Sequence, residues 1–348
     1  MRKQTKSKHR FFDGKAITLA AFGCLSCSFS SLYAQETADF KPSGSPIIVL
    51  FADYTAGIGS ESQTPGFSLT RSRLGYSYQL TPSLSAVSVV DINATQNGRG
   101  VHFHYAYARW AWKNLYISGG LVDLSQFSEQ EAFWGRRYLE KSFQDLNGFG
   151  ASSDLGITAG YRFTRWFEAD ASLIRGDDII QNRTGSLNRL ALGATFRPVG
   201  GLILRAYLDE NRHTSLETDN LTSSGNKNQR TLALFAGYRN ARFSIGSEFN
   251  YQQSKQFVDG GNYYGLSLYS GVALGRKFDL YARYDYVDTQ SPSIHTLNWN
   301  GIAHETVFIT GLEYHPLKNF QISPNYRYIR SFDGTATHFI GLHAGFSL

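Results

Sequence analysis

Residues 189–196 read RLALGATF, a stretch in which every second residue is apolar. Side chains of a β-strand point alternately to its two faces, so Leu190, Leu192 and Phe196 would share one face. Arg189 falls on the opposite face, together with small and polar residues. This pattern predicts a strand that has an apolar environment on one side and a polar environment on the other.

The same period of two returns along most of the chain. The clearest alternating segments are 73–80, 154–163, 189–197, 243–250 and 278–286. Beyond residue 34 no uninterrupted apolar run approaches the ~18 residues that a transmembrane helix requires. Because a membrane admits only helices and closed barrels, membrane residence would require these strands to close into a barrel.

Connections between the alternating segments come in two sizes that follow one another in turn. The seven short connections fall at 81–83, 113–114, 164–166, 198–201, 239–241, 275–277 and 315–319. The eight long polar connections lie near 58–66, 94–100, 123–151, 176–187, 210–228, 252–264, 288–303 and 331–336. We therefore predict an all-β fold, a transmembrane antiparallel up-and-down β-barrel of sixteen strands with long extracellular loops and short periplasmic turns.

Aromatic residues recur at outward positions beside the short connections, as expected for the aromatic girdle of a membrane barrel. The predicted girdle consists of Tyr78, Trp112, Phe163, Phe196, Tyr238, Tyr314 and Phe346. The strand at 101–112 is ambiguous, since either of its faces could meet lipid. Phe103 lies on one face and Trp110 on the other, and we place the tryptophan face outward.

Residues 1–34 have the form of a cleaved secretory signal peptide. A basic stretch precedes an apolar run from Ala16 to Phe29, and cleavage is expected after Ala34. A short periplasmic segment, 35–45, and the barrel, 46–348, would follow. Export of this kind places the protein in the bacterial outer membrane, in contact with its lipid.

Removal of this segment changes the charge balance. The full chain has 34 Lys and Arg against 28 Asp and Glu, but six of the basic residues and Asp13 lie in the expected signal peptide. The remaining 28 basic and 27 acidic residues give a net charge of +1, so nothing favours nucleic acid as a partner.

Cys24 and Cys27 lie in the same segment, which excludes disulfides and thiolate sites from the mature chain. We expect no cofactor and no metal.

Several motifs are similar to those of a known family. They are 67–76 (FSLTRSRLGY), 106–110 (AYARW), 134–138 (WGRRY), 141–143 (KSF) and 153–156 (SDLG). In these stretches, mainly in its first half, the chain resembles the phosphate-selective porin O/P family of outer-membrane channels. The resemblance implies passive diffusion of small hydrophilic solutes with a preference for anions, and a homotrimeric assembly would suit such a channel.

The longest connection, about 123–151, follows the fifth predicted strand. In general porins the loop at this place folds inward, so by resemblance this segment is a constriction loop. A barrel of sixteen strands is wide enough to enclose an aqueous lumen, which the loop would narrow.

Basic residues at inward positions are the candidates for guiding anions, since rings of Arg or Lys favour anions at a constriction. They are Arg71, Arg73, Arg109, Arg162, Arg189, Arg205, Arg283 and Arg327 on the strands and Arg136, Arg137 and Lys141 on the constriction loop. Inward acidic residues are about as numerous, so many of these bases could instead serve as paired wall residues. The lysine-rich ladder of the resembled family has no counterpart here.

Two alternatives to a porin follow from the same barrel. A non-conducting barrel could act as a surface adhesin or receptor through the long loops at 210–228 and 288–303. An outer-membrane hydrolase would need a serine, a histidine and an orienting partner on the outer face, and His343 with Ser347 lacks that partner.

Two further pairs resemble fragments of active sites. His102 and His104 share a predicted strand face, but no third metal ligand can be identified. Glu168 and Asp170 repeat on one face as catalytic carboxylate pairs do, although a water-filled lumen would also accommodate them as solvated charges.

Overall fold

The computed structural model describes residues 40–59, 65–95, 98–176, 187–212, 227–289 and 304–348. The expected signal peptide, 1–34, lies outside this range. Among the described residues, no helix has both the length and the apolar character needed to cross a membrane.

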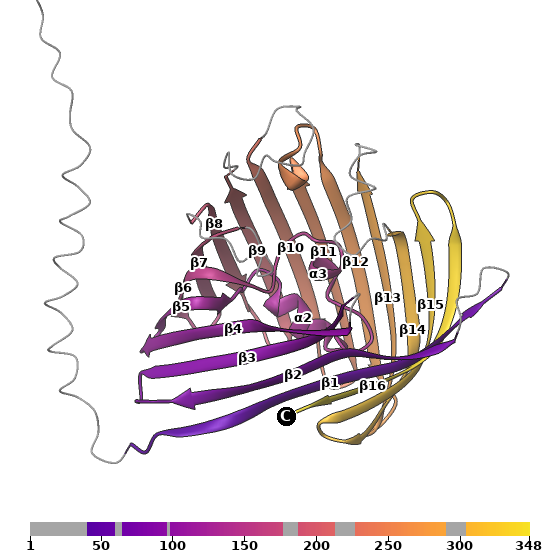
Figure 1. The fold of residues 1–348 in the computed structure, drawn as a ribbon, viewed down its shortest axis with the longest axis horizontal. Coiled ribbons are helices and arrows are strands. Elements are labelled where there is room, and N and C mark those ends of the chain that lie inside the picture. Colours follow the sequence, from indigo (N-terminus) through magenta and orange to yellow (C-terminus); the bar gives the residue numbers. More distant parts are fainter. Residues whose placement is uncertain (1–39, 60–64, 96–97, 177–186, 213–226, 290–303) are drawn as a thin grey trace, which may run out of the picture. The chain divides into compact units, whose positions relative to one another are not determined.

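Sixteen antiparallel strands follow one another around a closed barrel, as the sequence predicts (Figure 1). Each strand pairs with its neighbours in the sequence, and the first pairs with the last, from Val49 opposite Ser347 to Ile58 opposite His338. The strands are β1 (Ser43–Ile58), β2 (Gly66–Gln79), β3 (Leu84–Thr95), β4 (Gly98–Trp112), β5 (Leu115–Asp123), β6 (Ser153–Thr164), β7 (Phe167–Ile174), β8 (Arg189–Phe196), β9 (Leu202–Asn211), β10 (Gln229–Arg239), β11 (Phe243–Gln253), β12 (Tyr263–Ala273), β13 (Phe278–Thr289), β14 (His304–Leu317), β15 (Phe320–Ser331) and β16 (Ala336–Ser347).

The connections divide the barrel into two ends. The seven at one end, which we call the turn end, have two to five residues. The eight at the other, the loop end, are less uniform than the sequence led us to expect. Two of the predicted long connections are short, since only 96–97 separate β3 from β4 and only 332–335 separate β15 from β16. The polar residues that made these two look longer belong to the ends of the paired strands.

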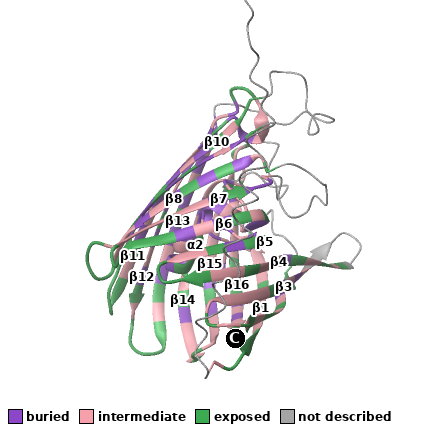
Figure 2. Ribbon diagram, turned by 90° about the vertical axis from the view of Figure 1, so that its left-hand side faces the viewer, coloured by how far each residue is buried: buried purple, intermediate pink, exposed green. Residues whose placement is uncertain are grey.

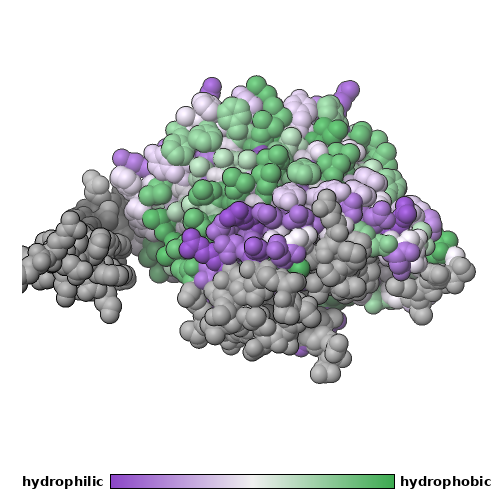
Figure 3. All heavy atoms as spheres, turned by 90° about the horizontal axis from the view of Figure 1, so that it is seen from above, coloured by the Kyte–Doolittle hydropathy of each residue, from purple (hydrophilic) through white to green (hydrophobic). Residues whose placement is uncertain are grey.

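The two faces of the sheet have opposite chemistry. Along β8 the outward Leu190 and Leu192 are 54% and 55% exposed, while the inward Arg189 is 5% exposed. Buried and exposed residues alternate in the same way along neighbouring strands (Figure 2). Apolar side chains cover much of the outer face seen from above (Figure 3). The outside of the barrel is therefore apolar and its inside polar, as a closed sheet in lipid requires.

A β-bulge explains why β4 is ambiguous in the sequence. Val89 of β3 lies opposite Tyr105 of β4, but Val90 lies opposite Phe103, so His104 is an extra residue on β4. An extra residue reverses the inward and outward alternation beyond it. Trp112 and Phe103 both face outward on β4 for this reason, although strict alternation along an unbulged strand would put them on opposite faces.

The connection between β5 and β6, residues 124–152, folds into the barrel, and we call it the inner loop (Figure 1). It contains α2 (Ser128–Trp134) and α3 (Phe143–Leu146). Gly135 ends α2 in the left-handed conformation, with φ of 69°. The principal buried apolar cluster lies between the inner loop and the inner wall and joins Phe133, Trp134, Tyr138 and Leu139 to residues of β10, β12, β13 and β14. The barrel thus has an apolar core within its otherwise polar interior.

We predict that Gly120→Ala destabilises the barrel beside the point where the inner loop leaves β5. Gly120 has φ of 129°, and an added Cβ would lie 2.5 Å from the carbonyl oxygen of Ala106. Backbone strain of this kind costs about 1–3 kcal/mol, so the denaturant midpoint followed by circular dichroism should fall. Gly119→Ala is the matched control, because no atom lies within 4 Å of its added Cβ. Equal midpoints for the two variants would contradict the prediction.

Candidate functional site

Aromatic packing holds the first half of the inner loop to one wall of the barrel. The Trp134 ring lies 5.7 Å from that of Tyr269 on β12 and 6.1 Å from that of Tyr281 on β13, both edge to face. Phe133 meets Phe235 of β10 at 5.5 Å. Such pairs contribute about 0.5–1.5 kcal/mol each beyond the area they bury. The loop therefore rests firmly on β10–β14 rather than crossing the lumen as a free strand.

Arg136 and Tyr138 add polar anchors at the same wall. Arg136 Nη2 lies 2.8 Å from Glu313 Oε2 on β14, and the guanidinium stands over the Tyr281 ring at 4.8 Å. The Tyr138 hydroxyl donates to Glu313 Oε1 at 2.9 Å. Both oxygens of one nearly buried carboxylate are thus bonded to the inner loop.

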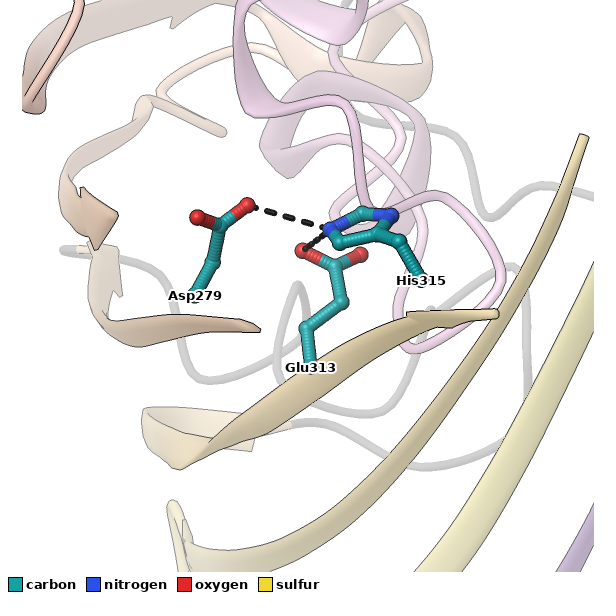
Figure 4. A group of neighbouring side chains, drawn as sticks. All are labelled: Asp279, Glu313 and His315. Atoms are coloured by element: carbon teal, nitrogen blue, oxygen red, sulfur yellow. Dashed lines mark hydrogen bonds and ion pairs between the residues drawn. The ribbon is translucent and has the colours of Figure 1, made fainter. Parts of the chain in front are cut away.

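Asp279, Glu313 and His315 form a small group around this anchor (Figure 4). His315 Nε2 lies 3.1 Å from Asp279 Oδ2 and 3.5 Å from Glu313 Oε2. One atom from each residue could in principle reach a common metal ion. Arg136 already lies 2.8 Å from the Glu313 oxygen and 3.7 Å from the Asp279 oxygen that such an ion would need. The arrangement is therefore better described as an ion-pair anchor of the inner loop.

Two arginines of the wall bind the turn that follows α2. Arg327 on β15 lies 2.7 Å from Glu140 Oε2 and donates to the carbonyl oxygen of Leu139 at 2.7 Å. Arg283 on β13 donates to the carbonyl oxygen of Lys141 at 2.7 Å and forms a bidentate pair with Asp285. Burial alone would raise the pKa of Glu140, but the guanidiniums of Arg327 and Arg283 hold it below its usual value. Glu140 is therefore a carboxylate anion in the folded barrel.

A network of buried amides fixes the second half of the inner loop. Gln126 Nε2 donates to Gln144 Oε1 and to the Phe149 carbonyl, both at 3.0 Å. Arg189 of β8 donates to Gln126 Oε1 at 2.8 Å, and Gln252 of β11 donates to the Phe149 carbonyl at 3.2 Å. Polar groups buried away from water need such partners, so the network specifies one position of the loop.

Most of the predicted pore-lining bases are paired with carboxylates. The contacts are Arg73 to Asp91 at 2.9 Å, Arg109 to Asp123 at 3.0 Å, Arg189 to Asp209 at 2.5 Å, Arg205 to Asp170 at 2.8 Å, Arg162 to Glu168 at 3.7 Å, and Arg137 both to Asp145 and to Glu131, the latter at 3.0 Å. Arg136, Arg283 and Arg327 are paired as described above. Such pairs cancel much of the field that the individual arginines would exert on a passing ion.

Arg71 differs from these bases. Its guanidinium stands 5.8 Å from the centre of the Phe51 ring, and no carboxylate of the described residues lies within ion-pair distance of it. The like charges of Arg73 and Arg137 act on it, and so do the carboxylates of Asp91 and Glu131, with which those two arginines are paired. The ammonium of Lys141 likewise has no ion pair within the described part of the chain. Arg136, in contrast, belongs to the Glu313 anchor, and Arg109 pairs with Asp123.

The predicted girdle residues lie on the outer face near the turn end. Tyr78, Trp112, Phe163 and Tyr238 are exposed there. Rings meet across two of the turns, at centre distances of 5.3 Å for Phe163 and Phe167 and 5.7 Å for Tyr238 and Phe243, and between neighbouring hairpins or strands, at 4.9 Å for Tyr314 and Phe278 and 5.1 Å for Phe196 and Trp166. Phe346 lies opposite Phe320.

The residues considered for catalysis or metal binding have other partners. His343 is buried and its Nδ1 lies 2.7 Å from Asn325 Nδ2 on the next strand. His104 is buried at the bulge of β4, and His102 lies opposite Asp91. Glu168 and Asp170 are engaged by Arg197 and Arg205.

Lys255 and Arg239, which nothing in the sequence pattern singles out, also contact the inner loop, Arg239 through the carbonyl oxygen of Phe133. Lys255 lies in a short 3₁₀ helix, η3 (Lys255–Phe257), and its ammonium donates to the carbonyl oxygens of Asn147 and Gly148 at 3.0 and 2.9 Å. Its position in a loop gave no periodic signal, and its partners are more than 100 residues away.

No protein-family model and no curated protein matches the chain. Solved structures share its fold. The outer membrane channel DcaP of Acinetobacter baumannii is 14% identical over 90% of this chain and 99% of that chain, with a TM-score of 0.64. The anion-selective porin from Comamonas acidovorans is 12% identical over 88% and 100%, with a TM-score of 0.64. The outer membrane protein OmpT of Vibrio cholerae, in a trimer form, is 12% identical over 89% and 100%, with a TM-score of 0.61. At these identities the likeness establishes the barrel fold alone.

We predict that Glu313→Gln loosens the inner loop while the barrel stays intact. The change removes the charge that Arg136 and Tyr138 share, and a hydrogen bond to a charged group contributes about 1.5–3 kcal/mol. Amide hydrogen exchange measured by mass spectrometry should become about tenfold faster or more in residues 135–140.

The control for this measurement is Glu210→Gln. Glu210 pairs with Arg230 on the outer side of the barrel, so its loss leaves the inner loop untouched. Unchanged exchange in the Glu313 variant would show that the bonds to Glu313 do not hold this part of the loop.

Proposed function

We propose that the protein is an outer-membrane porin that lets small hydrophilic solutes diffuse passively through its lumen. The observation that carries the proposal is a closed sixteen-stranded barrel, apolar outside and charged inside, whose longest connection folds against the inner wall. A barrel of sixteen strands is too wide for its wall side chains alone to fill it. The inner loop then acts as the constriction that sets the size limit.

The inner loop divides the lumen unequally in this proposal. Its apolar contacts lie mainly on β10–β14, with Phe51 of β1, Ile203 of β9 and Ile329 of β15 at the edge of the cluster, so the solute path runs between the loop and the opposite wall formed by β2–β5. Charged side chains with substantial exposure, such as Arg109 and Asp123, lie on that side. Water and hydrated solutes suit a wall of this kind, whereas an apolar wall would resist them.

An anion preference is part of the proposal, and Arg71 supports it. Arg71 is a cation without a carboxylate ion-pair partner among the described residues. Arginine fits carboxylate and phosphate groups bidentately, so anions with such groups are the favoured solutes. The likeness to a solved porin described as anion-selective agrees with this choice.

Location and assembly complete the proposal. Residues 1–34 act as a cleaved signal peptide, and the exposed apolar face of the strands contacts outer-membrane lipid. The barrels associate as a homotrimer, as in the trimer form of the similar Vibrio cholerae protein. Analytical ultracentrifugation in detergent should give three chains per particle. A monomer would refute the trimer but would leave the proposed channel function unaffected.

Conductance in a planar lipid bilayer tests the channel. Purified folded protein should add stepwise, ohmic current increments in potassium chloride, and a salt gradient should give a reversal potential of the sign expected for anion preference. A correctly folded barrel that carries no current would overturn the proposal in favour of an adhesin or receptor.

We predict that Arg71→Gln lowers the chloride-to-potassium permeability ratio by up to about tenfold, because a unit charge about 6 Å away attracts a passing chloride and repels a passing potassium ion by about 0.7 kcal/mol each in water. The reversal potential under a salt gradient measures this ratio. Arg230→Gln is the matched control, since Arg230 lies on the outward side of β10 and pairs with Glu210. If both variants keep the wild-type ratio, Arg71 does not lie beside the ion path.

A further inference from the structure

A buried ammonium group from the loop end of the barrel reaches the inner loop. Lys255 is 6% exposed, and its Nζ donates to the carbonyl oxygens of Asn147 and Gly148. The same nitrogen lies 4.1 Å from the centre of the Tyr263 ring and 5.4 Å from that of Phe149. Lys255 thus contacts the segment that leads from α3 back to β6.

No carboxylate of the described residues lies within 4.0 Å of this charge, so two carbonyl groups and two ring faces stabilise it. Burial lowers the pKa of Lys255 to about 7. Burying a charge without an anionic partner is unfavourable, and the four contacts must offset that cost. A surface lysine would avoid it, which makes a simple solubility role a poor explanation for this residue.

The backbone around Lys255 is itself in an unfavourable conformation. Ser254, Gln256 and Phe257 all have positive φ, at 52°, 55° and 64°. The Lys255 amide donates to the Gly261 carbonyl at 2.8 Å, and the Gln256 amide donates to Gln229 Oε1 at 2.9 Å. Strained residues persist only where surrounding contacts determine them, and here the strained turn directs the lysine side chain inward.

The part of the inner loop bound by Lys255 is also where other contacts converge. Phe149 stacks on Tyr263 at 4.8 Å and on Phe143 at 5.7 Å. Its carbonyl accepts the bonds from Gln126 and Gln252 described above. A shift of residues 147–149 would therefore displace α3 and the amide network together.

We propose that Lys255 is the positioning residue of the constriction, fixing the second half of the inner loop from the loop end of the barrel. This inference rests on the proposed channel function for its effect on current. If Lys255 fixes the inner loop, the position of the loop depends on the connection between β11 and β12, residues 254–262. A ligand or antibody that moved this connection would change conduction without entering the lumen.

Thiol labelling tests the position of the loop without reference to current. The part of the chain beyond residue 34 has no cysteine, so Leu146→Cys introduces one at the end of α3. In this background Lys255→Met should raise the labelling rate with a charged methanethiosulfonate reagent about tenfold or more. Lys255→Arg, which can still donate to both carbonyls, should stay near the background rate. Arg230→Met is the control, because Arg230 is exposed at the same end and pairs with Glu210, outside the connection 254–262.

Single-channel recording tests the consequence for conduction. Lys255→Met should show frequent brief substates where the parent protein shows steady current. An unchanged labelling rate, or a raised rate with unchanged steady current, would overturn the inference. If the parent barrel carries no current, the proposed function fails, while the labelling result still decides whether Lys255 holds the loop.

Correct folding of each variant is checked by heat-modifiable migration on gels. If Lys255→Met does not fold, Lys255→Gln takes its place, since its amide reaches at most one of the two carbonyls. Labelling of the Gln variant above the background rate supports the inference, and labelling at that rate overturns it.

Discussion

The pairing of β1 with β16 is the constraint on which the rest of the structure depends. An unpaired backbone amide in hydrocarbon costs several kcal/mol, so a sheet in lipid is stable only when it has no free edge. Closure assigns every side chain to the outer or the inner face, and the period-two pattern follows from that assignment. It also creates an enclosed interior, where charged residues such as Arg205 and Arg283 pair with carboxylates instead of meeting lipid.

The inner loop occupies part of the wide interior that closure of the barrel creates, and contacts with the wall hold it there. Sixteen strands leave a wide interior, and a polar loop lying there unsupported would lose conformational entropy without compensation. Aromatic contacts at Trp134, the shared Glu313 carboxylate and the Lys255 ammonium supply that compensation from three places on the wall. The charge pairs of the inner wall thus act mainly as structural ties, whereas Arg71 and Lys141 have no carboxylate partner among the described residues.

The fold could be predicted from the sequence because it depends on local regularities. In a stretch such as 189–196, the alternation of apolar and polar residues alone shows which side chains face outward and which face inward. The bulge at His104 could not be predicted, since it is defined by the register with β3 and looks like contradictory parity in β4 alone. The candidate site was predicted only in part for the same reason. Basic residues were identified by their inward parity, but whether each is paired depends on contacts such as Arg136 to Glu313, which join residues far apart in the chain.

The apolar cluster beneath Trp134 bears on the order in which the barrel assembles. The inner loop is made between β5 and β6, yet the surface that receives it belongs to β10, β12, β13 and β14. Contacts of such long sequence separation form late, because the chain between them must first be ordered. Until the C-terminal strands have formed, the aromatic side chains of the inner loop therefore have no wall to pack against and stay exposed.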